Sequence, residues 1–191
     1  HEQCADCHQQ ETKGFLTGKH GMRLNPDLTT APAPATPSMS ELNFQKEASH
    51  LTQGCNSCHG AHTFDTQTAA VDSCLGCHAD EHSLAFYESP HGKLWQQKKV
   101  QPNITAVSCA TCHMPQVETT INGEQFLLVQ HNQNDNLRPN EKMIRSACLD
   151  CHGLEFAIDA LADEKLIKNN FSGKPTEHIP SIDWAKARDE K

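Results

Sequence analysis

All ten cysteines of the chain fall into five copies of one short motif, Cys-x-x-Cys-His. The cysteine pairs are Cys4 and Cys7, Cys55 and Cys58, Cys74 and Cys77, Cys109 and Cys112, and Cys148 and Cys151. The histidines that end the motifs are His8, His59, His78, His113 and His152. This spacing is typical of c-type haem attachment, because the cysteines can add to both vinyl groups on one porphyrin edge while the histidine ligates iron. The sequence therefore predicts five covalently attached haem c groups.

Zinc sites, thioredoxin-like redox pairs and disulfides also use Cys-x-x-Cys. A four-thiolate zinc site consumes two such pairs, so five pairs would leave one unused. Zinc also gives no reason for a histidine to follow the second cysteine in every copy. The number and the form of the motifs together favour haem.

Each iron needs a ligand on its second face, and eight of the thirteen histidines lie outside the motifs. His20 and His91 each precede a glycine, which leaves room for a close approach of backbone to a ring. The predicted distal ligands are His20, His62, His82, His91 and His131, with His50 and His178 in reserve. The alternative ligands are Met22, Met39, Met114 and Met143. Two histidines per iron would give closed, low-spin haems with lower potentials than methionine ligation gives.

The composition leaves little polypeptide for an ordinary hydrophobic core. The chain has 191 residues, of which 5% are aromatic, and its mean hydropathy is −0.64. We therefore expect the porphyrins to form the core and the haem-free chain not to fold, as small metallodomains depend on their metal.

The charge and the hydropathy pattern limit the partners of the chain. A net charge of −8 makes nucleic acid an unsuitable partner and favours a redox protein with a cationic docking patch. No segment approaches the roughly 20 apolar residues of a membrane span. The first residue is His1 rather than methionine, which suggests a mature form whose export signal has been removed. We expect a periplasmic or extracellular protein, since haem is attached to this motif outside the cytoplasmic membrane.

The remaining pattern predicts a mainly α-helical, haem-cored fold with extensive irregular loops. A proline- and alanine-rich linker at 27–40 separates a one-haem segment, 1–26, from a four-haem segment, 41–191, and all are expected in one compact domain. A helix over 81–97 should break before Pro90. Asn122-Gly123 predicts a small β-hairpin near 117–129. A C-terminal helix beginning at Leu154 should end near Gly173 and Pro175, with the tail to Lys191 wrapping the core.

Several runs of sequence resemble multihaem cytochromes related to hydroxylamine oxidoreductase and octahaem tetrathionate reductase. The runs are CNSCHGAH from 55, CLGCHADEHS from 74, SPHG from 89, SCATCHMP from 108 and HNQNDNLRPNEKMIR from 131. The resemblance covers about 51–182 and implies bis-histidine relays around one haem with a vacant face. The chain departs from these families in having five motifs rather than eight and no Cys-x-x-Cys-Lys. Its single tyrosine, Tyr87, is not at a position equivalent to the haem-crosslinking tyrosine of hydroxylamine oxidoreductases.

These observations favour an electron-transfer protein, a pentahaem wire or shuttle between redox partners, over an enzyme. Two alternatives stay open. One is an oxidoreductase for a small nitrogen or sulfur compound, with an open first haem near Lys13, Lys19 and Arg23. The other is a subunit of a polymeric extracellular cytochrome filament, in which a histidine of one copy ligates iron in the next.

Overall fold

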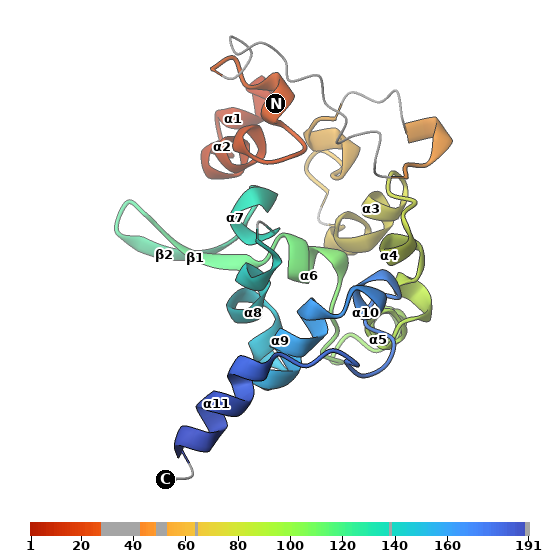
Figure 1. Cartoon of the computed structure of the whole chain (residues 1–191). Coiled ribbons are helices and arrows are strands. Elements are labelled where there is room, and N and C mark those ends of the chain that lie inside the picture. Colours follow the sequence, from red (N-terminus) through yellow and green to blue (C-terminus); the bar gives the residue numbers. More distant parts are fainter. Residues whose placement is uncertain (28–42, 49–52, 64, 138, 190–191) are drawn as a thin grey trace.

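The computed structural model describes residues 1–27, 43–48, 53–63, 65–137 and 139–189. Residues 28–40 of the predicted 27–40 linker, which include Met39, lie outside these ranges. His50 also lies outside them. The chain is mainly α-helical, as predicted, and its helices are short and joined by irregular turns (Figure 1). The α-helices are α1 (Glu2–Ala5), α2 (Gln9–Thr17), α3 (Ser73–Leu75), α4 (Glu81–Leu84), α5 (Pro90–Val100), α6 (Cys109–His113), α7 (Gln133–Leu137), α8 (Met143–Ser146), α9 (Leu154–Ala162), α10 (Glu164–Lys168) and α11 (Pro180–Asp189).

Seven further helical turns lie between these helices in the described part of the chain. Six are 3-10 turns: η1 (Met22–Leu24), η3 (Lys46–Ala48), η4 (Cys55–Ser57), η6 (Phe86–Glu88), η7 (Asn140–Lys142) and η8 (Cys148–Asp150). The seventh, η5 (Thr68–Asp72), is a π-helical turn that leads directly into α3 and the third motif.

The predicted hairpin is confirmed and extends away from the helices (Figure 1). Strands β1 (Gln116–Ile121) and β2 (Glu124–Val129) are antiparallel, with Ile121 opposite Glu124 at the turn. Asn122 and Gly123 have φ values of 52° and 86°. Two successive positive φ angles are the requirement of a type I′ turn, which explains why this dipeptide closes the hairpin.

The predicted break before Pro90 is also confirmed. Ser89 caps α5 by accepting a hydrogen bond from the backbone N–H of Gly92 at 3.1 Å, and Pro90 takes the first helical position. Proline suits that position because its missing N–H would have no partner in the helix. The helix over 81–97 is therefore divided into α4, η6 and α5.

The hydrophobic core is small, in agreement with the composition. Its central cluster is Val71, Phe86 and Trp95, which joins η5, η6 and α5. The Trp95 indole N–H is buried without a hydrogen-bond partner in the described part of the chain. The protein therefore leaves at least one buried polar group in need of a further partner.

The C-terminal region differs from its prediction in two respects. The single expected helix divides into α9 and α10 because the Asp163 side chain accepts hydrogen bonds from the N–H groups of Lys165 and Leu166 and starts a new helix. The tail does not wrap the core: α11 projects away from the other helices (Figure 1), and Trp184 is 79% exposed. Ion pairs explain this placement, since Lys186 binds Glu155 and His178 binds Asp159.

Candidate haem-binding sites

Each motif forms one turn of helix that places its two cysteines close together. In the first, second, third and fifth motifs the N–H of the final histidine donates to the carbonyl of the first cysteine, at 2.8 to 3.0 Å. The fourth motif is the helix α6 itself, capped by a reciprocal pair of bonds between Ser108 and Thr111. None of the ten cysteines is paired in a disulfide. The local geometry thus suits attachment of one group to each motif.

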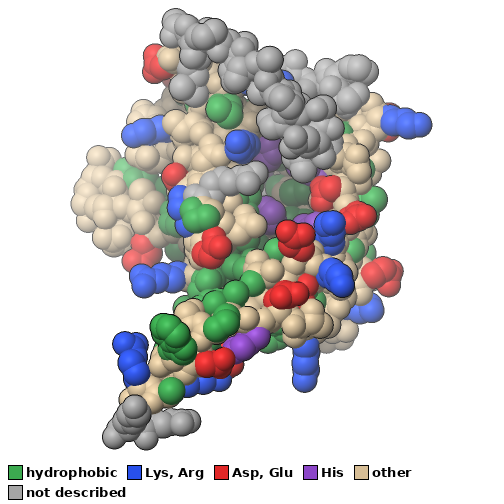
Figure 2. Space-filling model, viewed as in Figure 1, with side chains coloured by type: hydrophobic (Ala, Val, Ile, Leu, Met, Phe, Trp, Pro, Cys, Tyr) green, Lys and Arg blue, Asp and Glu red, His purple; other side chains and the backbone are tan. Residues whose placement is uncertain are grey.

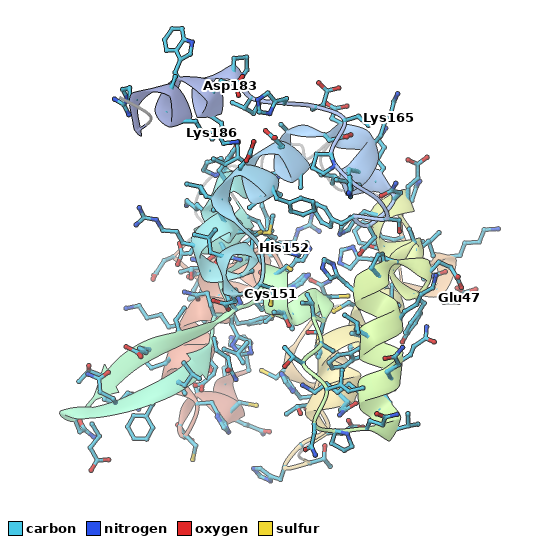
Figure 3. All side chains as sticks on the ribbon, turned by 90° about the horizontal axis from the view of Figure 1, so that it is seen from below. Glu47, Cys151, His152, Lys165, Asp183 and Lys186 are labelled. Atoms are coloured by element: carbon cyan, nitrogen blue, oxygen red, sulfur yellow. The ribbon has the colours of Figure 1, made fainter. Side chains whose placement is uncertain are left out.

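Four motif histidines face a second histidine from elsewhere in the chain. The pairs are His20 with His78, His131 with His59, His82 with His113, and His91 with His152. Their ring centroids are 6.2, 6.2, 6.0 and 6.1 Å apart, respectively. Histidine side chains are visible in a central recess of the face drawn in Figure 2, and His152 lies near the centre of the molecule in Figure 3.

The spacing of the ring pairs fits an iron held between two imidazoles. A metal lies about 2 Å from each ligating nitrogen, which places the two ring centroids roughly 6 Å apart. All four pairs have this separation, although they join different elements. The residues present therefore fit the axial ligands of four haems.

Two of these paired histidines outside the motifs are oriented by backbone carbonyls. Nδ1 of His82 lies 2.5 Å from the carbonyl oxygen of Ile167, and Nδ1 of His131 lies 2.9 Å from that of Val129. Because a carbonyl only accepts, Nδ1 carries the proton in both rings and Nε2 is left with its lone pair. This arrangement is common for metal-binding histidines, whose other nitrogen is usually fixed by an acceptor.

Burial keeps several of the paired imidazoles neutral. It lowers the pKa of His20, His78, His91 and His131 below the usual range. Burial, with a smaller effect of His82, lowers the pKa of His113 to about 4. A neutral imidazole has the free lone pair that iron needs, so protonation does not compete with binding near neutral pH.

The thiols of successive motifs are neighbours. Cys4 interacts with Cys55, and Cys74 interacts with Cys109. Burial and then Cys74 and Cys77 raise the pKa of Cys58 to about 11, and burial and then Cys148 raise that of Cys112 to about 12. The five motifs thus follow one another in space in the order of the sequence. A hollow of about 520 Å³, lined in part by Cys4 and Cys55, lies beside the first two.

The other predicted site residues form no such ring pair within the described ranges. His8 lies near enough to His131 to contribute to the lowering of the pKa of that ring, and His62 is exposed with a φ of 55°. Both ring nitrogens of His178 bind carboxylates, Nδ1 that of Asp159 at 2.8 Å and Nε2 that of Asp183 at 2.9 Å. Among the alternative methionines, Met143 is buried and Met22 is 37% exposed.

The glycines of the two His-Gly pairs lie in close contact with neighbouring protein segments. A side chain at Gly92 would collide with the carbonyl of Phe86, and one at Gly21 would collide with the carbonyl and ring of Phe15. The close approach is therefore between protein segments, and it holds the backbone next to His91 and His20 in place.

Several residues at the sites carry no motif and were not predicted. Phe156 stacks on His152 with ring centroids 4.8 Å apart, and Phe44 lies 5.4 Å from His78. Asn136 donates to the carbonyl of Cys112. Tyr87 donates to Asp72 at 2.5 Å, and burial and this bond raise its pKa to about 12. Only contacts across the fold identify these residues, because their sequence neighbourhoods are ordinary.

Residues 49–124 match the family model described as Cytochrome c3. This region contains the second, third and fourth motifs. No curated protein and no solved structure matches the chain. Together with the five attachment motifs, this match over part of the chain supports a multihaem c-type cytochrome with covalently bound haem c and a role in electron transfer.

Proposed function

We propose that the protein is a pentahaem electron carrier that passes electrons along closely spaced haems between redox partners. Each motif holds one haem c through its two cysteines, with its histidine as the proximal ligand. The distal ligands of the second, third, fourth and fifth haems are His131, His20, His82 and His91, respectively. The observation that carries the proposal is the nearly equal spacing of the four ring pairs, 6.0 to 6.2 Å.

The protein groups around the pairs suit electron transfer rather than substrate binding. Bound haem supplies one-electron redox chemistry. At the four haems with a ring pair, two neutral imidazoles would leave no coordination position for a substrate, and fixing Nδ1 of His82 and His131 holds these rings in one orientation. A rigid, closed ligand set changes little between oxidation states, which favours fast electron transfer.

The order of the motifs supports a continuous path. Thiol neighbours join the first motif to the second and so on to the fifth. Cys7 and Cys151, in the two terminal motifs, are exposed, as is Cys58 in the second motif. The first and fifth haems are the ends of this path, and partners could reach it at more than one haem.

The net charge of −8 supports redox partners with cationic docking patches, because complementary charge steers association. None of the described helices is long and apolar enough to cross a membrane. We place the protein in the periplasm or outside the cell, where this type of haem is attached. The sequence resemblance to the hydroxylamine oxidoreductase and octahaem tetrathionate reductase relatives supports the same relay architecture.

One observation favours a second candidate function, reaction with a small nitrogen or sulfur compound at the first haem. No ring pair with His8 is found among the described residues, and a first haem without a sixth ligand would offer an open face to such a compound. The same observation, with the exposed His62, fits a filament in which a second copy supplies the missing ligand.

Electron paramagnetic resonance of the oxidised protein, with carbon monoxide titration of the reduced form, tests these functions. Five low-spin irons without carbon monoxide binding support the carrier. One high-spin iron that binds carbon monoxide supports the enzyme. Low-spin irons that become high-spin on dilution support the filament. Mass spectrometry of the denatured chain checks the number of haems, and any number other than five contradicts the pentahaem proposal.

A further inference from the structure

The turn after α10 has an unusual backbone. Asn170 and Phe171 are consecutive residues with φ values of 54° and 59°. The N–H of Phe171 donates to the carbonyl of Leu166 at 2.7 Å, and that of Asn170 donates to the carbonyl of Ile167 at 3.0 Å. This pair of bonds is the Schellman arrangement that ends many helices, with Asn170 at the position usually taken by glycine.

The side chain of Asn170 reaches a histidine that is distant in sequence. Its Nδ2 donates to the backbone carbonyl of His82 at 3.0 Å and lies 3.3 Å from Nε2 of the same residue. Asn170 is 6% exposed, so this contact is shielded from water. The backbone carbonyl of Ile167, three residues before Asn170, accepts a hydrogen bond from Nδ1 of His82 at 2.5 Å. The end of α10 therefore fixes both the backbone and the ring of His82.

The ring of Phe171 contacts two histidines from different pairs. Its centroid lies 6.0 Å from that of His82, with the rings at 88°, and 6.3 Å from that of His91, with the rings at 58°. His82 faces His113 of the fourth motif, and His91 faces His152 of the fifth. One aromatic side chain thus touches one member of each pair.

Closing the helix does not require these two side chains. Glycine at position 170 would adopt the same left-handed conformation more easily. A bulky residue with positive φ, as at Phe171, is rare and is usually retained at functional sites. The turn is also held from outside, since Asp163 caps α10 and accepts from both the N–H and the hydroxyl of Thr176 at 2.8 Å.

We propose that the Asn170–Phe171 turn is a positioning element that sets the orientation of His82 and His91 together, and thereby tunes the fourth and fifth haems as a pair. The inference rests on the proposed function, because it takes these two histidines as distal ligands. Asn170 acts on the fourth haem alone, through its hydrogen bond to the backbone carbonyl of His82, because Nε2 of that ring is the nitrogen that would bind iron. Phe171 acts on both haems, through the edges and faces of the two rings.

The test uses the full-length, haem-loaded protein and two variants. Asn170→Gly keeps the left-handed backbone and removes the bonds to His82, whereas Phe171→Ala removes the shared ring contact. Electron paramagnetic resonance and a spectroelectrochemical titration are the readouts. Variants His82→Met and His91→Met mark the signals of the fourth and fifth irons.

We expect Asn170→Gly to shift the g values and the reduction potential of the iron marked by His82→Met only. Phe171→Ala should shift both marked irons, and Phe171→Tyr, which keeps an aromatic ring, should restore the wild-type spectrum. The matched control is Asn169→Ala, since Asn169 braces the same turn through Ser172 and is not bonded to His82 or His91. This control should shift neither iron.

Three results would overturn the inference: unchanged signals in Asn170→Gly and Phe171→Ala, shifts confined to other irons, or equal shifts in Asn169→Ala. If mass spectrometry shows that Phe171→Ala has lost haem, the test uses Phe171→Leu in its place. Leucine keeps most of the bulk and removes the aromatic ring, so the same shifts at both marked irons are expected. A wild-type spectrum without low-spin signals at the marked irons would instead refute the proposed function.

Discussion

The imidazole ring centroids of His20 and His78 lie 6.2 Å apart, so a residue of the N-terminal segment faces the third motif. The same segment is joined to the residues after the hairpin, since Asn134 donates to the carbonyl of Thr17 at 3.1 Å. The first motif is thus held against the rest of the chain by side-chain contacts as well as by its covalent connection.

Removing the His20 ring should open one iron. In His20→Ala we expect a single low-spin signal to be replaced by a high-spin one, with new carbon monoxide binding to the reduced protein. The physical reason is that His78 would be left as the only imidazole on that iron. His178→Ala is the matched control, because both nitrogens of His178 are bound to carboxylates and its loss should leave all spin states unchanged. Unaltered spin states in His20→Ala would contradict the ligand assignment.

The attachment of α11 should weaken at alkaline pH. Hydrogen bonds to Asp159 and then Asp183 raise the pKa of His178 from 6.5 to about 9. Since the folded pKa is the higher one, the contribution of His178 is complete below about 6.5 and is lost as the pH rises through about 9. Hydrogen exchange of residues 180–189, corrected for the intrinsic rate, should therefore accelerate between pH 7 and pH 10.

The acid side of this dependence has the opposite sign. The His178 hydrogen bond lowers the pKa of Asp159, so that contribution is present above the ordinary aspartate range and is lost as the pH falls below it.

The variant His178→Asn should remove the acceleration of exchange at alkaline pH. An acceleration that persists in this variant would show that another group, such as Lys186 in its ion pair with Glu155, controls the attachment.

A methyl group at Gly92 should destabilise the protein. In Gly92→Ala the new Cβ would collide with the Phe86 carbonyl, and relieving the collision must move α5 or η6. We expect a loss of about 1–3 kcal/mol, as for other overpacked sites, measured by urea unfolding. Gly153→Ala is the control, because its Cβ would meet no atom within 4 Å. Equal midpoints for the two variants would contradict the close packing at Gly92.

The chain should not fold without haem attachment. In the part of the chain that the structure describes, the buried hydrophobic side chains are few, and the central cluster consists of Val71, Phe86 and Trp95. We expect the protein made without haem attachment to show little helical circular dichroism and no cooperative urea transition. A cooperative transition in this material would show that the polypeptide core is sufficient.

Local chemistry explains which parts of the fold the sequence predicts well. The hairpin follows from Asn122 and Gly123, and the helix break follows from Ser89 and Pro90, because each depends on the φ preferences of adjacent residues. The division at Asp163 is not predicted, although aspartate is a common helix cap, because Gly173 and Pro175 are the stronger helix-ending signals and the helix is expected to continue to them.

The candidate haem sites also have a part that the sequence predicts and a part that it does not. The attachment residues are contiguous and can be read from the chain, whereas the pairing of His131 with His59 or His20 with His78 depends on the folded path. Asn170 and Phe171 have no motif at all, and their role appears only through contacts with His82 and His91. Contacts between residues distant in sequence were the part that sequence reasoning could not supply.

The long-range pairing of His131 with His59 also has a consequence for the biogenesis of the protein. Translation and export proceed from the N-terminus, so in the other three pairs the distal histidine precedes its motif and is already present when that haem is attached. The second motif differs, because His59 emerges well before His131. The distal ligand of this haem is absent until the hairpin has followed, and we expect a chain arrested before His131 to carry a reactive, half-ligated iron at the second motif.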